Sequence, residues 1–233
     1  MFQVAVILAF QIFIIVMSVV IHEVAHGLAA LKLGDPTAKY AGRLTLNPLK
    51  HLDWVGSVFV PVLMLWLVGI PFAWARPVPY NPYNLRNQRF GPALVGLAGP
   101  LSNIFLAFVF GFAARMLPLA ASAKEALASQ FLRGDYEGIA YALSGSLSSI
   151  FFLLFMITVV INLFLAFFNL IPIPPLDGSK LLFSLLKLRT ETVIMLEQFG
   201  FLFLLVVVLF FQGALGIFLF AILSLFLSYV VGI

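Results

Sequence analysis

Long apolar stretches separated by short polar segments make up most of this chain. Several windows contain no Asp, Glu, Lys or Arg, and each is long enough to cross about 30 Å of hydrocarbon at roughly 1.5 Å per helical residue. This pattern predicts an all-α polytopic membrane protein with about five to six transmembrane helices. The windows free of charged residues are 2–21, 54–75, 90–114, 138–176 and 198–233.

Two of these windows depart from a simple span. The window 54–75 is interrupted by two glycines and two prolines, and residues 76–89 are rich in Pro and Asn. We therefore expect a re-entrant or irregular segment near 54–90. The window 198–233 would be about 54 Å long as one helix, which exceeds a single span. Gln212-Gly213 near its middle favours a hairpin of two short spans.

Composition supports a membrane protein and narrows its partners. Hydrophobic residues make up 63% of the chain and charged residues only 9%, against about one quarter in soluble domains. The net charge of +4 fits basic loops on the cytoplasmic side of a bilayer. No basic run resembles a nucleic-acid footprint, so we expect no nucleic-acid partner. The chain has no cysteine, so a metal site must use nitrogen and oxygen ligands.

One short motif carries the chemistry. The first window predicts a helix from about Phe2 to Lys32, and His22-Glu23-Val24-Ala25-His26 lies toward its C-terminal end. Positions i and i+4 share one face of a helix, so both imidazoles can reach one zinc ion. Glu23 lies beside that metal and can take a proton from its water, which is the role of a general base.

A catalytic zinc needs a third protein ligand, and Asp177 is the strongest candidate. Such sites use three protein ligands and a water. Asp177 ends the long window 138–176, after prolines that release the backbone from the helix. Read alone, Asp177 would be an ordinary N-cap of the helix that follows. Beside two histidines that lack a ligand, we favour the metal, with one zinc per chain held by His22, His26 and Asp177.

These residues together resemble the site-2 protease family of intramembrane zinc proteases. The resemblance rests on the motif 22–26, the element Ala98-Gly99-Pro100-Leu101-Ser102-Asn103, and Asn169 followed by Asp177-Gly178. It implies that Asp177 is the third zinc ligand and that Asn169 faces the reacting carbonyl as an electrophilic helper. It also implies a minimal member, without a PDZ or nucleotide-sensing domain.

The sequence thus predicts an intramembrane zinc endopeptidase that cuts peptide bonds in or near transmembrane segments of a partner protein. We expect a single domain over 1–233, with a catalytic core of about 1–190 and a C-terminal helical hairpin at about 198–233. A prokaryotic cell (inner) membrane is the expected location. The alternative is a membrane transporter of a metal ion or small solute that uses the same ligands. Glu23 is poorly explained by transport.

The chemistry also constrains the topology. The two histidines and Asp177 must meet at one depth, and each lies near the C-terminal end of its long helix. The two helices must then run in the same direction, so an odd number of membrane crossings separates them. Windows 54–75 and 90–114 together would make two crossings, which is an even number. We therefore predict that 54–75 enters and leaves on one side. The N-terminus and loop 118–145 would be outside, and the active site nearer the cytoplasm.

Overall fold

The computed structural model describes residues 1–53, 56, 59, 62–63, 66, 76–143 and 146–233. These residues are mainly helical and include no strand, which confirms the expected all-α class. Four helices among them are long and apolar enough to span a membrane, so the protein is polytopic. The window 54–75 falls largely outside the described residues. In chain order the elements are α1 (Phe2–Lys32), α2 (Thr37–Tyr40), η1 (Pro48–Lys50), η3 (Pro82–Asn84), α4 (Gly91–Met116), α5 (Ala121–Arg133), α6 (Tyr136–Ala142), α7 (Leu147–Asn169), α8 (Asp177–Leu186), α9 (Thr190–Phe226) and the π-helix η4 (Leu227–Val231).

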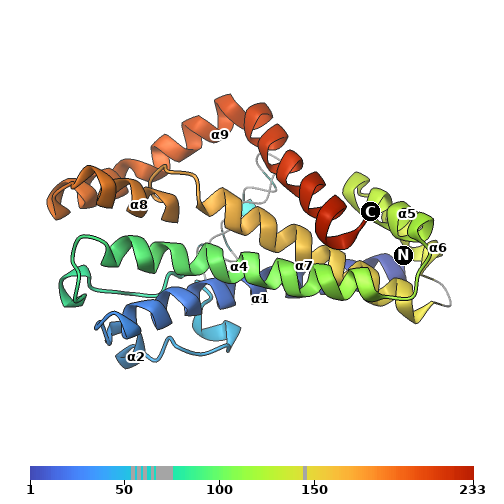
Figure 1. Ribbon diagram of the computed structural model, residues 1–233, viewed down its shortest axis with the longest axis horizontal. Coiled ribbons are helices and arrows are strands. Elements are labelled where there is room, and N and C mark those ends of the chain that lie inside the picture. Colours follow the sequence, from blue (N-terminus) through green and yellow to red (C-terminus); the bar gives the residue numbers. More distant parts are fainter. Residues whose placement is uncertain (54–55, 57–58, 60–61, 64–65, 67–75, 144–145) are drawn as a thin grey trace.

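Three long helices form the centre of the bundle. Helices α1 and α7 run in the same direction, and α4 runs between them in the opposite direction (Figure 1). Helix α4 contacts α1, α7 and α8. Its N-terminal half places Gly96 and Gly99 against neighbouring side chains, where an added Cβ would lie at 3.0 Å or less from its nearest atoms. Small residues of this kind let helix backbones approach closely in membranes.

The connecting segments lie at opposite ends of this bundle. Residues 33–53 and 76–90 lie at the end where α1 finishes, and α5 and α6 lie at the other end (Figure 1). The Arg76 backbone N–H donates to the His51 carbonyl oxygen at 2.9 Å. The chain therefore leaves and rejoins the described structure at one place. The prediction that 54–75 enters and leaves on one side concerns residues largely outside the described part of the chain, and it stays a prediction.

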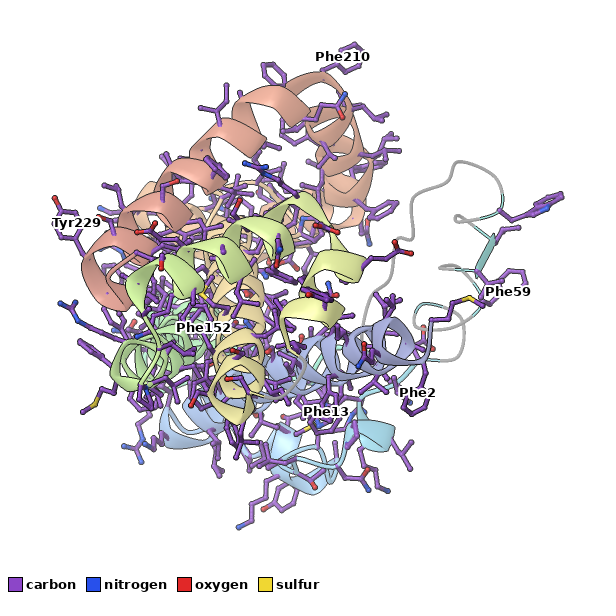
Figure 2. All side chains as sticks on the ribbon, turned by 90° about the vertical axis from the view of Figure 1, so that its right-hand side faces the viewer. Phe2, Phe13, Phe59, Phe152, Phe210 and Tyr229 are labelled. Atoms are coloured by element: carbon purple, nitrogen blue, oxygen red, sulfur yellow. The ribbon has the colours of Figure 1, made fainter. Side chains whose placement is uncertain are left out.

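The core is built from inward-facing side chains of α7. Phe152, Met156 and Val159 are fully buried and pack with Ala107 of α4 and with residues of the C-terminal end of the chain. By contrast, Phe13 of α1 and Phe210 of α9 point away from the bundle (Figure 2). Such exposed aromatic side chains fit a surface covered by lipid.

Helix α9 crosses the length of the molecule with a sharp bend (Figure 1). The bend lies at Phe211, whose φ of −116° and ψ of 15° are not helical. This position is one residue before Gln212-Gly213, where the sequence suggested a turn. The structure thus has two helical halves that meet at a kink, and the hairpin of two short spans stays a prediction.

Candidate metal centre

The two histidines of the motif lie side by side on one face of α1. His22 and His26 are both buried, and their ring centroids are 4.6 Å apart. Gly99 of α4 makes room for them, because a Cβ at that position would lie 2.5 Å from His26 Nε2 and 2.6 Å from His22 Nε2. The imidazoles therefore fill a space that only a glycine on the facing helix leaves open.

Asp177 reaches the histidines from the opposite end of the sequence. Helix α7 ends at Asn169, and the proline-rich turn that follows delivers Asp177 as the first residue of α8. Its Oδ2 atom lies 3.1 Å from Nε2 of His22 and 3.1 Å from Nε2 of His26. Leu176 occupies the N-cap position of α8, and the Asp177 carboxylate contacts His22 and Lys180 instead. Asp177 therefore does not act as the ordinary N-cap that its position alone suggested.

The outer ring nitrogens of both histidines are already engaged. His22 Nδ1 lies 2.5 Å from Asn103 Oδ1, and His26 Nδ1 lies 2.7 Å from the Val95 carbonyl oxygen. Because each of these partners is an oxygen acceptor, Nδ1 of each ring would keep its proton with zinc bound, and Nε2 would then offer its lone pair to the metal. Two imidazole lone pairs and one carboxylate oxygen thus lie within 4.8 Å of one another. This donor set fits zinc.

A buried polar network fixes the orientation of Asn103. Its amide nitrogen donates to Asn162 Oδ1 at 2.7 Å, and the Asn162 amide in turn donates to Ser18 Oγ at 2.9 Å. The three residues come from α4, α7 and α1. Unpaired amides inside a bilayer would be costly, so these bonds both join the three helices and set which oxygen faces His22. The sequence singled out the element that contains Asn103, but not the residues that its side chain contacts.

Lys180 orients the Asp177 carboxylate from the other side. Its ammonium donates to Asp177 Oδ1 at 2.8 Å, which leaves Oδ2 facing the histidines. Burial alone would raise the pKa of Asp177, but the hydrogen bonds with both histidines and the Lys180 charge hold that pKa well below its usual range. Burial likewise lowers the pKa of Lys180, but the Asp177 charge outweighs it and raises this pKa to about 12. Sequence reasoning missed Lys180.

Glu23 lies outside the cluster of three donor atoms. Its Oε2 atom accepts a hydrogen bond from the Val78 backbone N–H at 2.8 Å. The Val78 side chain is buried against α1, where a Cβ at Gly27 would lie 2.9 Å from it. A backbone amide of the segment 76–80 thus holds the carboxylate in place. Such a donor could not be read from the sequence.

The buried carboxylate of Asp35 anchors this segment. It accepts hydrogen bonds from the Asn81 backbone N–H at 2.7 Å and from the Asn84 amide at 2.9 Å. Thr37 contributes two further donors, its backbone N–H and its hydroxyl. Burial would raise the pKa of Asp35, but these hydrogen bonds together lower it, so the group stays ionised. The charge therefore fixes residues 81–84 against the end of α1.

Asn169 is a predicted site residue whose side chain bonds within its own helix. It is the last residue of α7, half-buried, and its amide donates to the Leu165 carbonyl oxygen at 2.8 Å. Among the described residues it makes no hydrogen bond with the histidines, Glu23 or Asp177. Its role at the reacting carbonyl stays a prediction.

Comparisons with known proteins agree with this geometry. The family model described as Peptidase family M50 matches residues 10–211. A relative from Bacillus subtilis, "Putative zinc metalloprotease YwhC", is 38% identical over 193 residues, which are 82% of this chain and 76% of the relative. "Putative zinc metalloprotease Rip2" of Mycolicibacterium smegmatis is 31% identical over 194 residues, 83% of this chain and 64% of the relative. Its Mycobacterium tuberculosis namesake is 28% identical over 193 residues, 82% of this chain and 63% of the relative. No solved structure matches the chain.

Proposed function

The chain belongs to peptidase family M50 and is a membrane zinc metalloprotease, and from this premise we propose that it is an intramembrane endopeptidase with Glu23 as its general base. One observation carries the proposal. The Nε2 atoms of His22 and His26 both lie 3.1 Å from Asp177 Oδ2, inside a bundle of membrane-spanning helices. An ionisable cluster at that depth is costly, so it is expected to be functional.

We propose that His22, His26 and Asp177 hold the zinc. When bound, zinc supplies Lewis acidity that polarises a carbonyl and lowers the pKa of a water ligand from about 15.7 to about 7. Glu23 is held beside these donors by the Val78 amide. From there its carboxylate accepts the proton of the attacking water and returns it to the leaving amine nitrogen. Asn169, at the end of α7, donates its amide to the developing oxyanion.

The substrate is a transmembrane protein or peptide. Carbonyl groups of an intact helix are hydrogen-bonded, so a substrate helix has to unwind locally before one of them reaches the metal. The site lies within the helix bundle, so it would meet the middle of a substrate's membrane-spanning segment and not a free chain end. This favours an endopeptidase over an exopeptidase. All the residues that we assign to the chemistry lie in the core of about 1–190, and we propose that residues of about 198–233 belong to the same domain.

The orientation follows from charge. The loops 33–53 and 76–90 lie at the end of the bundle nearest the metal centre and carry Lys39, Arg43, Lys50 and Arg76 among their basic residues. Basic loops face the cytoplasm in most membrane proteins. We therefore place the active site toward the cytoplasmic side of a prokaryotic cell membrane, which fits the bacterial sources of the relatives.

The test compares Glu23→Gln with the wild-type protein. Glutamine keeps the acceptor for Val78 but cannot take a proton, so zinc content should stay at about one per chain. Cleavage of transmembrane peptides should fall by about 10²- to 10⁴-fold. Exposed Glu125→Gln on α5 is the matched control and should behave as wild type. Retained cleavage would overturn the role of Glu23 as base, and loss of zinc would make Glu23 a ligand or a structural residue.

A further inference from the structure

A cavity of about 540 Å³ opens beside the metal centre, at the end of the bundle that carries the basic loops. Its walls come from three segments: residues 80–92, helix α8, and the first turns of α9. Lys180 lies in its wall and is bonded to Asp177 at 2.8 Å, so the cavity is a neighbour of the proposed metal site but is lined by other residues. The proposed catalytic mechanism assigns it no role.

The charges of the lining leave one positive charge without a counterpart. The lining holds three cations, Arg89, Lys180 and Lys187, and one anion, Glu197. Asp177 already neutralises Lys180. Glu197 offsets one of the remaining two cations, which leaves a net charge of +1. The cavity is therefore electrostatically suited to a ligand with a single negative charge.

The backbone at Lys187 adds to this picture. Lys187 ends α8 in the left-handed region, with a φ of 55° and a ψ of 38°. That conformation is disfavoured for side chains other than Gly, Asn or Asp, and Gly or Asn is the usual choice at this position. A lysine here keeps a cation at the mouth of the cavity that the usual glycine would not supply.

Part of the lining is apolar, and α8 carries exposed apolar side chains next to it in the chain. Phe183, Leu188, Val193 and Ile194 contribute side chains to the cavity. Leu185 and Leu186 of α8 are 59% and 60% exposed. With 10 residues, α8 is too short to span a bilayer, and Lys187 at its C-terminal end is exposed. A ligand that fills this cavity needs an anionic head and an apolar body.

We propose that this cavity binds an anionic phospholipid with one phosphodiester charge, such as phosphatidylglycerol. The phosphate would lie between Arg89 and Lys187, and the acyl chains would pass over the exposed leucines of α8. Basic pockets between membrane helices at the cytoplasmic face bind anionic headgroups for the same electrostatic reason. Free phosphate would leave the apolar lining uncovered, and an acidic peptide would not use the leucine surface. The proposal does not depend on the protease activity.

The test titrates delipidated full-length protein in neutral detergent with phosphatidylglycerol, phosphatidylcholine or inorganic phosphate, and counts bound molecules by native mass spectrometry. Phosphatidylglycerol should occupy one site per chain. Arg89→Gln with Lys187→Gln should weaken its binding by roughly thirtyfold, at about 1 kcal/mol per cation. The matched control removes two exposed cations of the same end outside the cavity, Lys39→Gln with Lys50→Gln, and should bind as wild type.

A second variant predicts a gain and so does not depend on a loss that misfolding could cause. Glu197→Gln removes the opposing charge and should tighten phosphatidylglycerol binding by roughly fivefold. Equal binding of phosphatidylcholine, or equal loss in both double variants, would overturn the proposal. So would inorganic phosphate that binds as tightly as the lipid, or an acidic peptide that binds in its place.

Discussion

Helices α7 and α9 are almost equally apolar, yet the structure uses them in opposite ways. In the most apolar stretch of α7, 50% of the residues are buried inside the protein, against 11% in the most apolar stretch of residues 191–231, which include most of α9. The buried face of α7 includes Asn162, which joins the network behind His22. Helix α9 instead directs Phe210 outward, with 78% of its surface exposed (Figure 2).

The difference teaches what apolarity does and does not decide. Lipid tails are as apolar as a leucine side chain, so hydrophobicity places a helix in the membrane without choosing its neighbours. Small residues and polar groups make that choice. Gly99 of α4 admits the histidine rings, and the amides of Asn103 and Asn162 bond across helices. Helix α9 lacks a comparable buried network among the described residues, and most of its surface is left for lipid.

The largest contrast between the two regions should come from removing a carboxylate. Asp177→Ala should lose zinc and activity together, because two imidazoles leave the site one ligand short. Glu191→Ala, which removes an exposed carboxylate at the start of α9, should lose neither. Elemental analysis of the purified proteins measures the zinc. Full zinc content and activity in Asp177→Ala would refute the proposed ligand set.

The same glycine substitution should have opposite consequences in the two regions. Gly99→Ala places a Cβ 2.5 Å from His26 Nε2, so α4 must move away and zinc should be lost or bound much more weakly. At Gly213 of α9 an added Cβ meets nothing within 4 Å. Gly213→Ala should keep zinc and raise thermal stability slightly, since alanine favours a helix by about 1 kcal/mol. Thermal unfolding measures the stability of both variants, and zinc titration measures their zinc affinity. Similar zinc affinities in the two variants would contradict the close approach of α4 to the histidines of α1.

A smaller effect on zinc affinity is expected at a residue that contacts a proposed metal ligand but not the metal itself. Asn103→Ala removes the acceptor that orients His22 but none of the three proposed ligands. Loss of such a partner typically weakens metal binding by about 10- to 100-fold. Ser224→Ala, which removes an exposed hydroxyl on α9, is the control and should leave zinc affinity unchanged. Zinc competition with a chelator of known affinity measures both, and an Asn103→Ala affinity equal to wild type would remove the positioning role.

The smallest effect on activity is expected from single cysteines that report the two ends of the bundle. Ser122 on α5 and Lys50 in the basic loop are both exposed, and the chain has no cysteine of its own. Ser122→Cys and Lys50→Cys should remain active and react with a membrane-impermeant thiol reagent from opposite faces of sealed vesicles. Labelling from the same face would exclude the predicted topology.

How much the sequence predicts depends on which atoms do the work. His22, His26 and Asp177 could be named because metal chemistry requires those side chains, and the structure brings them together across 155 residues. The Val95 carbonyl and the Val78 N–H could not be named, because every residue carries the same backbone groups. Lys180 was missed for a related reason. In the sequence, a lysine three residues after an aspartate indicates only an ordinary ion pair on a helix surface, and the structure alone shows that this pair lies inside the protein.

The fold was predictable in class and in part of its path. Apolar windows predicted the long helices, and the predicted helix from about Phe2 to Lys32 agrees with the bounds of α1. The prolines after α7 correctly suggested a turn that redirects Asp177. The bend in α9 was not predicted as such: Gln212-Gly213 favoured a hairpin, whereas the helix bends at Phe211, a residue with no tendency to break a helix.

The distance along the chain between the histidines and Asp177 has a consequence for biosynthesis. The first histidine precedes Asp177 by 155 residues. At translation rates of about 5–20 residues per second, about 8–30 s pass between the synthesis of these two residues. Throughout that interval α1 lies in the membrane without its carboxylate partner. A nascent or truncated chain that stops before α8 therefore holds an incomplete site, and the newly made enzyme stays inert beside its neighbours until its helices have inserted in the correct order.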